Sequence, residues 1–457
     1  MRVDFIPRRS GSGRIKTPYD IGQTIGRNRR QADRNRRRPD DRGSRSERGR
    51  FRNACVRARG IAAVSRTRLF GSLCALVFLV NFARVVFAPL VGEFIDAFGI
   101  REGTAGLIVT LAWLGSAAPR LPAGWALTRF TRRRVIVVSG AMLTAGALGV
   151  ALAPGVLALM VAAFAVGLAS GVYFVAANPF ISELFPQRVG RVMGVHGMAS
   201  QLSAVIAAPA VTVALWYDWR YAFYALALAA AASTVLFVAL AKRTDLPDAG
   251  ASDTDFLAAA RGEWKLIAAG VVLMGLTSFV WQGLFNFYEL YMIDKGLPRA
   301  TARNLLTVIF AAGVPAFLVS GDLADRLPHV PYLLGIVSSF VVGVVLVVVA
   351  EGLAAVIAAS VVVGFAIHML FPAGDTYLLA SLPDESRASA YAMFSAGMMT
   401  TQAAGSWVVG EAVEAGAGYD AVFLALAGGL VVLVAAYAAL YRLGRVPGGA
   451  AGATRAA

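Results

Sequence analysis

Twelve long apolar segments dominate this sequence and restrict what it can fold into. Runs of roughly 20 apolar residues match the ~30 Å hydrocarbon core of a bilayer when they are helical. Hydrophobic residues make up 58% of the chain, above the ~45–50% typical of soluble proteins. We therefore predict an all-α integral membrane protein with twelve transmembrane helices. The segments are 69–92, 104–127, 134–152, 156–180, 192–216, 221–241, 265–292, 301–320, 331–350, 353–380, 387–412 and 419–441.

The charges of the loops predict the orientation of these helices. Arg and Lys follow every even-numbered segment, whereas the alternate loops are mostly acidic. Basic loops stay in the cytoplasm by the positive-inside rule. Lys295, Arg299 and Arg303 in the seventh loop go against this trend without reversing it. Both termini are therefore expected in the cytoplasm, and the chain is expected to be a multi-pass protein of the plasma membrane.

Polar stretches divide the chain into domains. Residues 242–264 have the composition of a cytoplasmic linker and separate two six-helix bundles, 69–241 and 265–441. A short tail, 442–457, follows the last segment.

The N-terminal tail, residues 1–68, carries almost all of the net charge. It holds 21 Arg and Lys residues against 6 Asp and Glu residues. Its few apolar residues predict disorder. It is either a dispensable or wrongly assigned start, or an arm that contacts anionic lipid head groups. The tail has few aromatic residues that could stack on bases among its many arginines, so no nucleic-acid partner is expected.

A short motif occurs twice in the sequence. Gly124 to Arg129 reads GWALTR, and Gly321 to Arg326 reads GDLADR, 197 positions later. Gly167 and Gly364 are separated by the same offset. A repeat of this length, built from apolar helices, predicts two pseudo-symmetric halves.

With these motifs, residues 69–441 resemble the major facilitator superfamily. That family carries G-x-L-A-D-R-x-G-R-R between helices 2 and 3 and a degenerate copy between helices 8 and 9. In the first copy here, Thr128 stands in place of the acidic residue. The resemblance implies two six-helix bundles that move by alternating access, and a conformational latch at the motif. The residues carried over to that latch are Gly124, Arg129, Arg132, Arg133, Gly321, Asp325 and Arg326.

The second copy is expected to hold the competent latch. Asp325 can face the N-terminus of the fifth helix, where the helix dipole is positive, and Arg326 can hold it there. A topology signal combined with a turn is the alternative reading, and it needs only the arginines.

Polar residues inside the apolar segments are candidates for substrate binding, because a charge in the membrane is costly. Arg84 can bind a carboxylate or phosphate with two parallel hydrogen bonds; alternatively it pairs with a structural acid or with carbonyl groups. Gln282, Asn286 and Glu289 lie on one helical face, although Glu289 is near the outer end and could be solvated. His368 either couples protons or is a satisfied core histidine. Asn178 and Asp375 complete the candidates.

These features predict a secondary transporter of a small organic solute, with Arg84 favouring an anion and H+ or Na+ as the coupling ion. Efflux of drugs or metabolites by proton antiport is an alternative, disfavoured because Ala163 stands where many such proteins have an arginine. A non-transporting sensor or scaffold, acting through the basic tail, is the other alternative. The sequence contains no pattern typical of an enzyme, a metal site or a cofactor site, and a monomer is expected.

Overall fold

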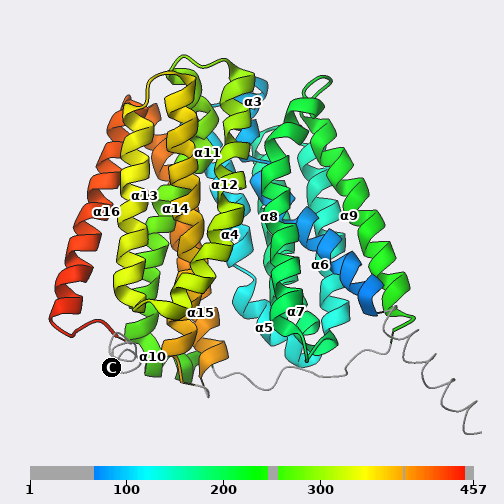
Figure 1. Cartoon of the computed structure of the whole chain (residues 1–457). Coiled ribbons are helices and arrows are strands. Elements are labelled where there is room, and N and C mark those ends of the chain that lie inside the picture. The colour runs from blue at the N-terminus through cyan, green and yellow to red at the C-terminus, as the bar shows by residue number, and fades with distance from the viewer. Residues whose placement is uncertain (1–65, 245–255, 384–385, 448–457) are drawn as a thin grey trace, which may run out of the picture. The chain divides into compact units, whose positions relative to one another are not determined.

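The computed structural model describes residues 66–244, 256–383 and 386–447, and all regular elements in these ranges are helices (Figure 1). Ten helices are long and apolar enough to cross a membrane, judged by length and composition. The prediction of an all-α membrane fold is thereby confirmed. Residues 1–65 of the predicted tail, residues 245–255 of the predicted linker and residues 448–457 lie outside the described residues.

The first half begins with a helix over Arg66–Val85, which we call the first helix. The elements after it are η1 (Ala88–Leu90), α3 (Val91–Phe98), α4 (Glu102–Ala117), α5 (Arg120–Arg129), α6 (Arg132–Ala151), α7 (Val156–Leu184), α8 (Val189–Ala214) and α9 (Arg220–Ala241). The second half consists of α10 (Phe256–Gly270), η2 (Val271–Gly275), α11 (Leu276–Asp294), α12 (Arg299–Arg326), α13 (His329–Val349), α14 (Gly352–Ser381), α15 (Arg387–Glu414) and α16 (Tyr419–Arg442).

The second apolar segment, expected as one helix over 104–127, is broken. α4 ends at Ala117 and α5 begins at Arg120, with Pro119 between them. Proline has no N–H to donate, and its ring clashes with the carbonyl of the preceding turn. The first segment, expected over 69–92, is interrupted in the same way: its helix ends before η1, which contains Pro89.

The second half begins earlier than expected. α10 begins at Phe256, so residues 256–264 are helical although the linker was expected to extend over them. Ala, Leu, Arg and Glu, all strong helix formers, supply most of this stretch. A π-helical turn, η2, then joins α10 to α11. The three elements form one candidate span, Arg261–Asp294.

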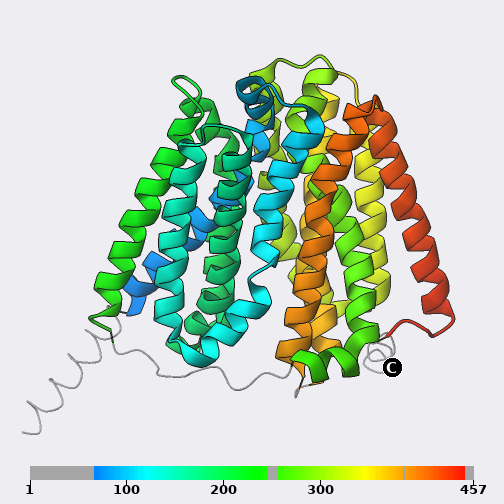
Figure 2. The same cartoon turned by 180° about the vertical axis from the view of Figure 1, so that it is seen from behind.

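The two halves meet along two pairs of helices. α8 lies beside α12 (Figure 1), and α4 lies beside α15 (Figure 2). A Cβ atom on Gly106 of α4 would lie only 2.5 Å from the Ser406 carbonyl oxygen of α15. The Thr110 hydroxyl donates to the Ala403 carbonyl over 2.8 Å. Since lipid gives helices no hydrophobic drive to associate, such close contacts between small residues stabilise the interface.

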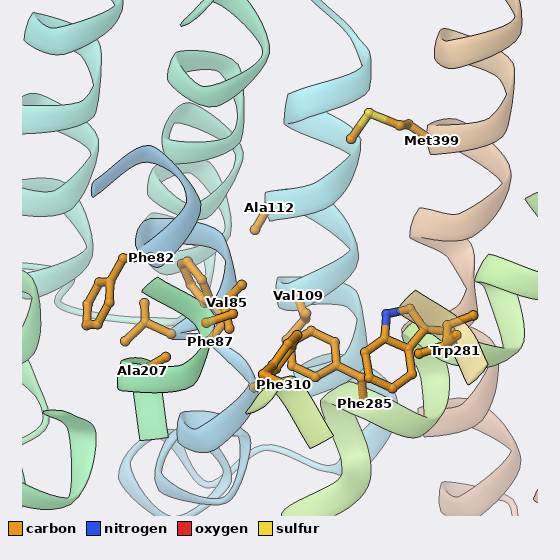
Figure 3. Close-up of a cluster of buried hydrophobic side chains, with 14 of the residues drawn as sticks. Phe82, Val85, Phe87, Val109, Ala112, Ala207, Trp281, Phe285, Phe310 and Met399 are labelled. Carbon is orange, nitrogen blue, oxygen red and sulfur yellow. The ribbon is translucent and has the colours of Figure 1, made fainter. Parts of the chain in front are cut away.

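We name the two ends of this helical body by the elements found there. The α3 end carries α3 and the turn between α11 and α12, whereas the α10 end carries the start of α10 (Figure 1). An apolar cluster contains side chains from both halves (Figure 3). Phe310 of α12 contacts Trp281 and Phe285 of α11, and the first half contributes Val85 and Val109, which are almost fully buried.

The offset of 197 positions also relates contacts between helices. A Cβ atom on Gly167 of α7 would lie 2.1 Å from the Ala112 carbonyl oxygen of α4. A Cβ atom on Gly364 of α14 would lie 2.2 Å from the Ile309 carbonyl oxygen of α12. Ala112 and Ile309 are themselves 197 positions apart. The same close approach is therefore repeated in each half.

Candidate functional site

Arg84 lies one residue before the end of the first helix and is only 6% exposed. Its Nη2 donates to Asn81 Oδ1 over 2.7 Å, and its Nη1 donates to Ser116 Oγ over 3.2 Å. The guanidinium lies over the Trp113 ring, 4.7 Å from its centroid. In the described part of the chain, no carboxylate forms an ion pair with this group and Nε has no hydrogen-bond partner. The site therefore holds a buried positive charge that could receive an anion.

The second half has an aromatic counterpart of this site. Trp281 and Phe310 stand 197 positions after Arg84 and Trp113. Their rings contact each other, with centroids 5.9 Å apart, just as the Arg84 guanidinium contacts Trp113. The positive charge thus belongs to the first half alone, and an anion site here would be asymmetric.

Asp375, another predicted site residue, lies closer to the α10 end. It accepts a hydrogen bond of 2.8 Å from the Tyr391 hydroxyl of α15. Arg120 of α5 donates to Ser395, also on α15, over 2.8 Å. Arg120 interacts electrostatically with both Asp375 and Tyr391. Opposite charges from the two halves therefore approach each other in this region.

Gln282 and Asn286 of α11 are each 1% exposed. Asn286 Nδ2 donates to Ser406 Oγ of α15 over 2.8 Å, and it also donates to the Gln282 carbonyl. Gln282 Nε2 and Asn286 Oδ1 are buried without hydrogen-bond partners among the described residues. One unused donor and one unused acceptor thus lie one helical turn apart, as expected for a wall that contacts a polar substrate.

Glu289 differs from Gln282 and Asn286 in that it is 2% exposed and its charge is paired with a buried arginine. The alternative that it is solvated is wrong. Its two carboxylate oxygens accept from Arg303 Nη2 and Nε over 2.8 and 3.1 Å. Arg303 lies inside α12 and is 5% exposed. Its earlier assignment to a loop is therefore wrong as well.

Arg303 also joins the two halves at the α3 end. Its Nη2 donates to Glu93 of α3 over 2.9 Å. Arg299 donates to Asp96 of α3 over 2.9 Å and lies 3.6 Å from Glu93. We call Glu93, Asp96, Glu289, Arg299 and Arg303 the α3-end charge cluster.

His368 of α14 is 4% exposed and packs among aromatic rings. Its ring lies 5.5, 5.7 and 6.0 Å from those of Phe310, Trp281 and Phe317. Nδ1 lies 2.7 Å from the carbonyl oxygen of Gly364, one turn earlier. These contacts favour the reading of a satisfied core histidine.

Asn178 of α7 is half-buried, and its Oδ1 has no partner among the described residues. It lies one helical turn after Phe174, whose ring centroid is 5.4 Å from the Arg84 guanidinium. It is thus on the α10-end side of Arg84 and is not among the residues that contact Arg84.

The two motif copies lie at the α10 end. In the first copy, Gly124 and Arg129 belong to α5, and Arg132 and Arg133 begin α6. In the second copy, Gly321, Asp325 and Arg326 belong to the last turns of α12.

The ion pairs of the two copies differ from those expected. Arg132 pairs with Glu183 near the end of α7, so the anion missing from the first motif comes from another helix. Arg326 pairs with Asp322 over 2.8 Å on the surface of α12. Asp325 is exposed and belongs to no ion pair in the described ranges. The latch thus stays a prediction.

Sequence reasoning missed the partners of the site residues. Asn81 and Arg84 are three positions apart on one helix, a spacing that could have indicated their contact. Trp113, Ser116 and Arg303 reach their partners from other helices. Since no pattern within one segment records a contact between segments, no signal in this single sequence could have found them.

Comparison with known proteins agrees with this architecture. The sequence profile described as the Major Facilitator Superfamily matches residues 73–356 and 301–456. A citrate-proton symporter of Salmonella typhi is 25% identical over 315 residues, which are 60% of this chain and 70% of the relative. A probable sulfoacetate transporter of Cupriavidus necator is 26% identical over 189 residues, which are 40% of this chain and 43% of the relative.

Solved transporters share the fold at low sequence identity. A bacterial homologue of the human lysosomal transporter Spinster aligns with a TM-score of 0.66 and 16% identity, covering 82% of this chain and 96% of its own. A transporter of the POT family aligns with a TM-score of 0.69 and 14% identity, covering 81% and 95%. Together with the profile match over most of the chain, the repeat and the helical architecture, these similarities show that the chain belongs to the major facilitator superfamily.

Proposed function

We propose that this secondary transporter of the plasma membrane carries a small organic anion by alternating access. Rocking of residues 69–241 against residues 265–441 would open a site between them to each side in turn. In this proposal the chain crosses the membrane twelve times. The ten candidate spans are completed by α4 with α5, and by α15.

The proposed orientation follows from the charges at the two ends. Arg129, Arg132 and Arg133 lie at the turn between α5 and α6, at the α10 end. The α3 end carries the acidic residues Glu93 and Asp96. By the positive-inside rule, the α10 end and both termini are in the cytoplasm, and the α3 end faces outward.

Arg84 is the observation that carries the proposal. A buried guanidinium without a carboxylate partner is costly, because its charge is removed from water without compensation. The ring of Trp113 returns part of that free energy through a cation–π contact. A carboxylate or sulfonate of the substrate would supply the rest, with hydrogen bonds to a charged donor worth about 1.5–3 kcal/mol each.

The relatives support an anion and favour H+ as the coupling ion. One relative is a citrate-proton symporter and another is a probable sulfoacetate transporter, and citrate and sulfoacetate are both organic acids. Gln282 and Asn286 would contact the uncharged polar groups of such a substrate.

The latch at Asp325 is proposed for the opposite conformation. Here the α3-end charge cluster holds the outward end closed, and Asp325 is exposed. When the α10 end closes instead, Asp325 would approach the N-terminus of α8, where the helix dipole favours an anion.

Uptake into proteoliposomes tests the anion assignment. We would impose an inside-alkaline pH gradient and measure uptake of radiolabelled citrate, succinate and sulfoacetate by the wild type, Arg84→Ala and Arg84→Lys. Arg84→Ala is expected to lower uptake about tenfold or more, the equivalent of ~1.4 kcal/mol or more. Arg84→Lys should lose less uptake, because lysine keeps the positive charge although it lacks the planar guanidinium group.

Arg442→Gln, which removes an exposed arginine at the end of α16, is the matched control and should leave uptake unchanged. If Arg84→Ala transports every anion that the wild type carries at the wild-type rate, the anion assignment is wrong.

A further inference from the structure

One buried arginine, Arg84, and one half-buried arginine, Arg120, approach the same region of the first half. Arg84 donates to Ser116 of α4 over 3.2 Å. Arg120 follows Ser116 by four positions, about one helical turn, across the break at Pro119. The two guanidinium groups are close enough to repel each other electrostatically. The Nε atom of each is buried without a partner among the described residues.

The second half supports this convergence independently. Trp281 and Phe317 stand 197 positions after Arg84 and Arg120. Both aromatic rings contact one residue, His368, with centroids 5.7 and 6.0 Å away. Side chains at these two positions therefore converge in the half where both are apolar, and the two arginines occupy the corresponding sequence positions of the first half.

The equivalence of the two halves at this depth rests on a further contact. A Cβ atom on Gly171 would lie 2.4 Å from the Ser116 carbonyl oxygen. A Cβ atom on Gly313 would lie 2.6 Å from the His368 ring. Gly313 stands 197 positions after Ser116, and His368 stands 197 positions after Gly171. The contact between α4 and α7 in the first half thus corresponds to the contact between α12 and α14 in the second half.

An acid from the other half faces the second arginine. Arg120 donates to Ser395, and Asp375 accepts from Tyr391. Tyr391 and Ser395 are four positions apart on α15, so they lie on one face of that helix. The Arg120 and Asp375 charges are therefore held on neighbouring turns of the same helix, each through its own partner.

The charges of these three groups determine how many protons must accompany each ligand. With Asp375 ionised, Arg84, Arg120 and Asp375 sum to one positive charge. A ligand with one acid group neutralises the site, whereas a ligand with two leaves it with one excess negative charge. One proton on Asp375 removes that excess, and in a region that excludes water an uncompensated charge is costly.

We propose that the substrate is a small organic dianion, with one acid group on Arg84 and the other on Arg120, and that Asp375 takes up the coupling proton when the second acid group binds. This inference rests on the proposed function. The ligand's second acid group replaces the Asp375 charge beside Arg120. Asp375 gains one proton from a hydronium ion of the acidic side, so that one O–H bond breaks in the donor, which becomes water, and one forms on Asp375. No bond in the ligand changes, and the proton and the dianion are released together on the other side.

Binding measurements with matched ligands test the role of Arg120. Sulfoacetate carries two acid groups, and ethanesulfonate has a similar length with one. We would measure the affinity of the purified full chain for both, and for succinate and citrate, by calorimetry at pH 6 and pH 8. The wild type should bind a dianion about tenfold or more tightly than ethanesulfonate, since a second charged contact is worth about 1.5–3 kcal/mol. Arg120→Gln should remove that preference, so that sulfoacetate and ethanesulfonate bind this variant with affinities within about twofold of each other.

Asp375→Asn tests the proton site. It also keeps the inference testable if Arg120→Gln fails to fold. In the wild type, sulfoacetate should bind more tightly at pH 6 than at pH 8, because protonated Asp375 accommodates the dianion. In Asp375→Asn, which is neutral at every pH, that dependence should disappear. In proteoliposomes the same variant should keep exchange of internal for external sulfoacetate and lose accumulation driven by the pH gradient.

The outcomes separate this inference from the proposed function. If Arg84→Ala weakens anion binding while Arg120→Gln weakens sulfoacetate and ethanesulfonate equally, the proposed function stands and the dianion inference is overturned. The inference is also overturned if no dianion binds more tightly than ethanesulfonate, or if Asp375→Asn keeps the pH dependence. Loss of accumulation in the control Arg442→Gln would contradict both.

Discussion

At the scale of single residues, Arg84 is held in place by the side chains around it. The Trp113 ring lies 4.7 Å from its guanidinium, and Asn81 and Ser116 orient its terminal nitrogens. An arginine fixed in this way loses little rotamer freedom when an anion binds, because the side chain is already ordered. Trp113 is therefore a positioning residue for the proposed anion site.

Substitution of Trp113 should weaken anion transport through Arg84. Trp113→Leu removes the cation–π contact, worth about 0.5–2 kcal/mol, so the apparent affinity in uptake assays should fall about twofold to thirtyfold. Trp113→Phe keeps an aromatic face and should lose less. If the leucine and phenylalanine variants lose equal affinity, the ring does not act through its π face.

His368 gives the opposite prediction. Its Nδ1 bonds within its own helix, and three aromatic rings surround it. His368→Phe should therefore keep uptake and its pH profile, with thermal stability changed by less than about 1.5 kcal/mol, as for a swap of similar volume. If the pH profile of uptake by His368→Phe differs from that of the wild type, as expected for Asp375→Asn, His368 carries the coupling proton after all.

At the scale of elements, the repeat is most visible where helix backbones touch. Gly167 and Gly364 pack on carbonyl oxygens of α4 and α12, and a Cβ atom at either position would come within 2.2 Å of that oxygen. Gly167→Ala and Gly364→Ala should each lower the melting temperature in detergent, because overpacking of this kind costs about 1–3 kcal/mol. Gly335→Ala on α13, with nothing within 4 Å, is the matched control. Equal melting temperatures for all three variants would mean that α7 and α14 can move away from α4 and α12 at no cost in stability, which would contradict the prediction.

The sequence predicted the helices well and their interruptions poorly. Runs of about 20 apolar residues can span a bilayer only as helices or closed barrels, which is why ten spans could be located from hydropathy alone. Pro119 breaks α4 from α5, yet Pro179, Pro209 and Pro372 lie inside continuous helices. Whether a proline breaks a helix depends on which neighbours satisfy the freed carbonyl group, and those neighbours are distant in sequence.

At the scale of the whole molecule, the same limit applies to the contacts between halves. Arg303 was predicted as a loop residue that opposes the orientation rule, yet it lies 5% exposed between two carboxylates. Its partner Glu93 is 210 positions earlier. Composition could divide the chain into two halves, but the surfaces that join them follow from how twelve segments assemble.

The α3-end charge cluster should control the opening of that end. Glu93→Gln weakens the link between the halves and leaves the Arg303–Glu289 pair within the second half intact. Loss of a partly exposed charged contact, about 0.5–1.5 kcal/mol, should raise the population of molecules whose α3 end is open about twofold to tenfold. The reporter is Val109→Cys, buried at the interface, labelled by a membrane-impermeant maleimide after Cys55 and Cys74 are replaced by serine. Asp218→Asn, which breaks an ion pair with Arg220 inside the first half, should leave labelling unchanged.

The motif at the end of α12 should act on the same equilibrium in the opposite direction. Asp325 and Asp322 are both exposed in this conformation, and only Asp322 pairs with Arg326. If Asp325 latches the α10 end when that end closes, Asp325→Asn destabilises only the other conformation. Labelling of Val109→Cys should then fall, and uptake should drop about fivefold or more, corresponding to a coupling free energy of ~1 kcal/mol or more. Asp322→Asn should change neither, because its ion pair stays within one exposed helical turn and is worth only ~0.3–0.5 kcal/mol. Equal effects of the two variants would reduce the motif to a topology signal, since the surface charge of α12 would then matter and the position of the carboxylate would not.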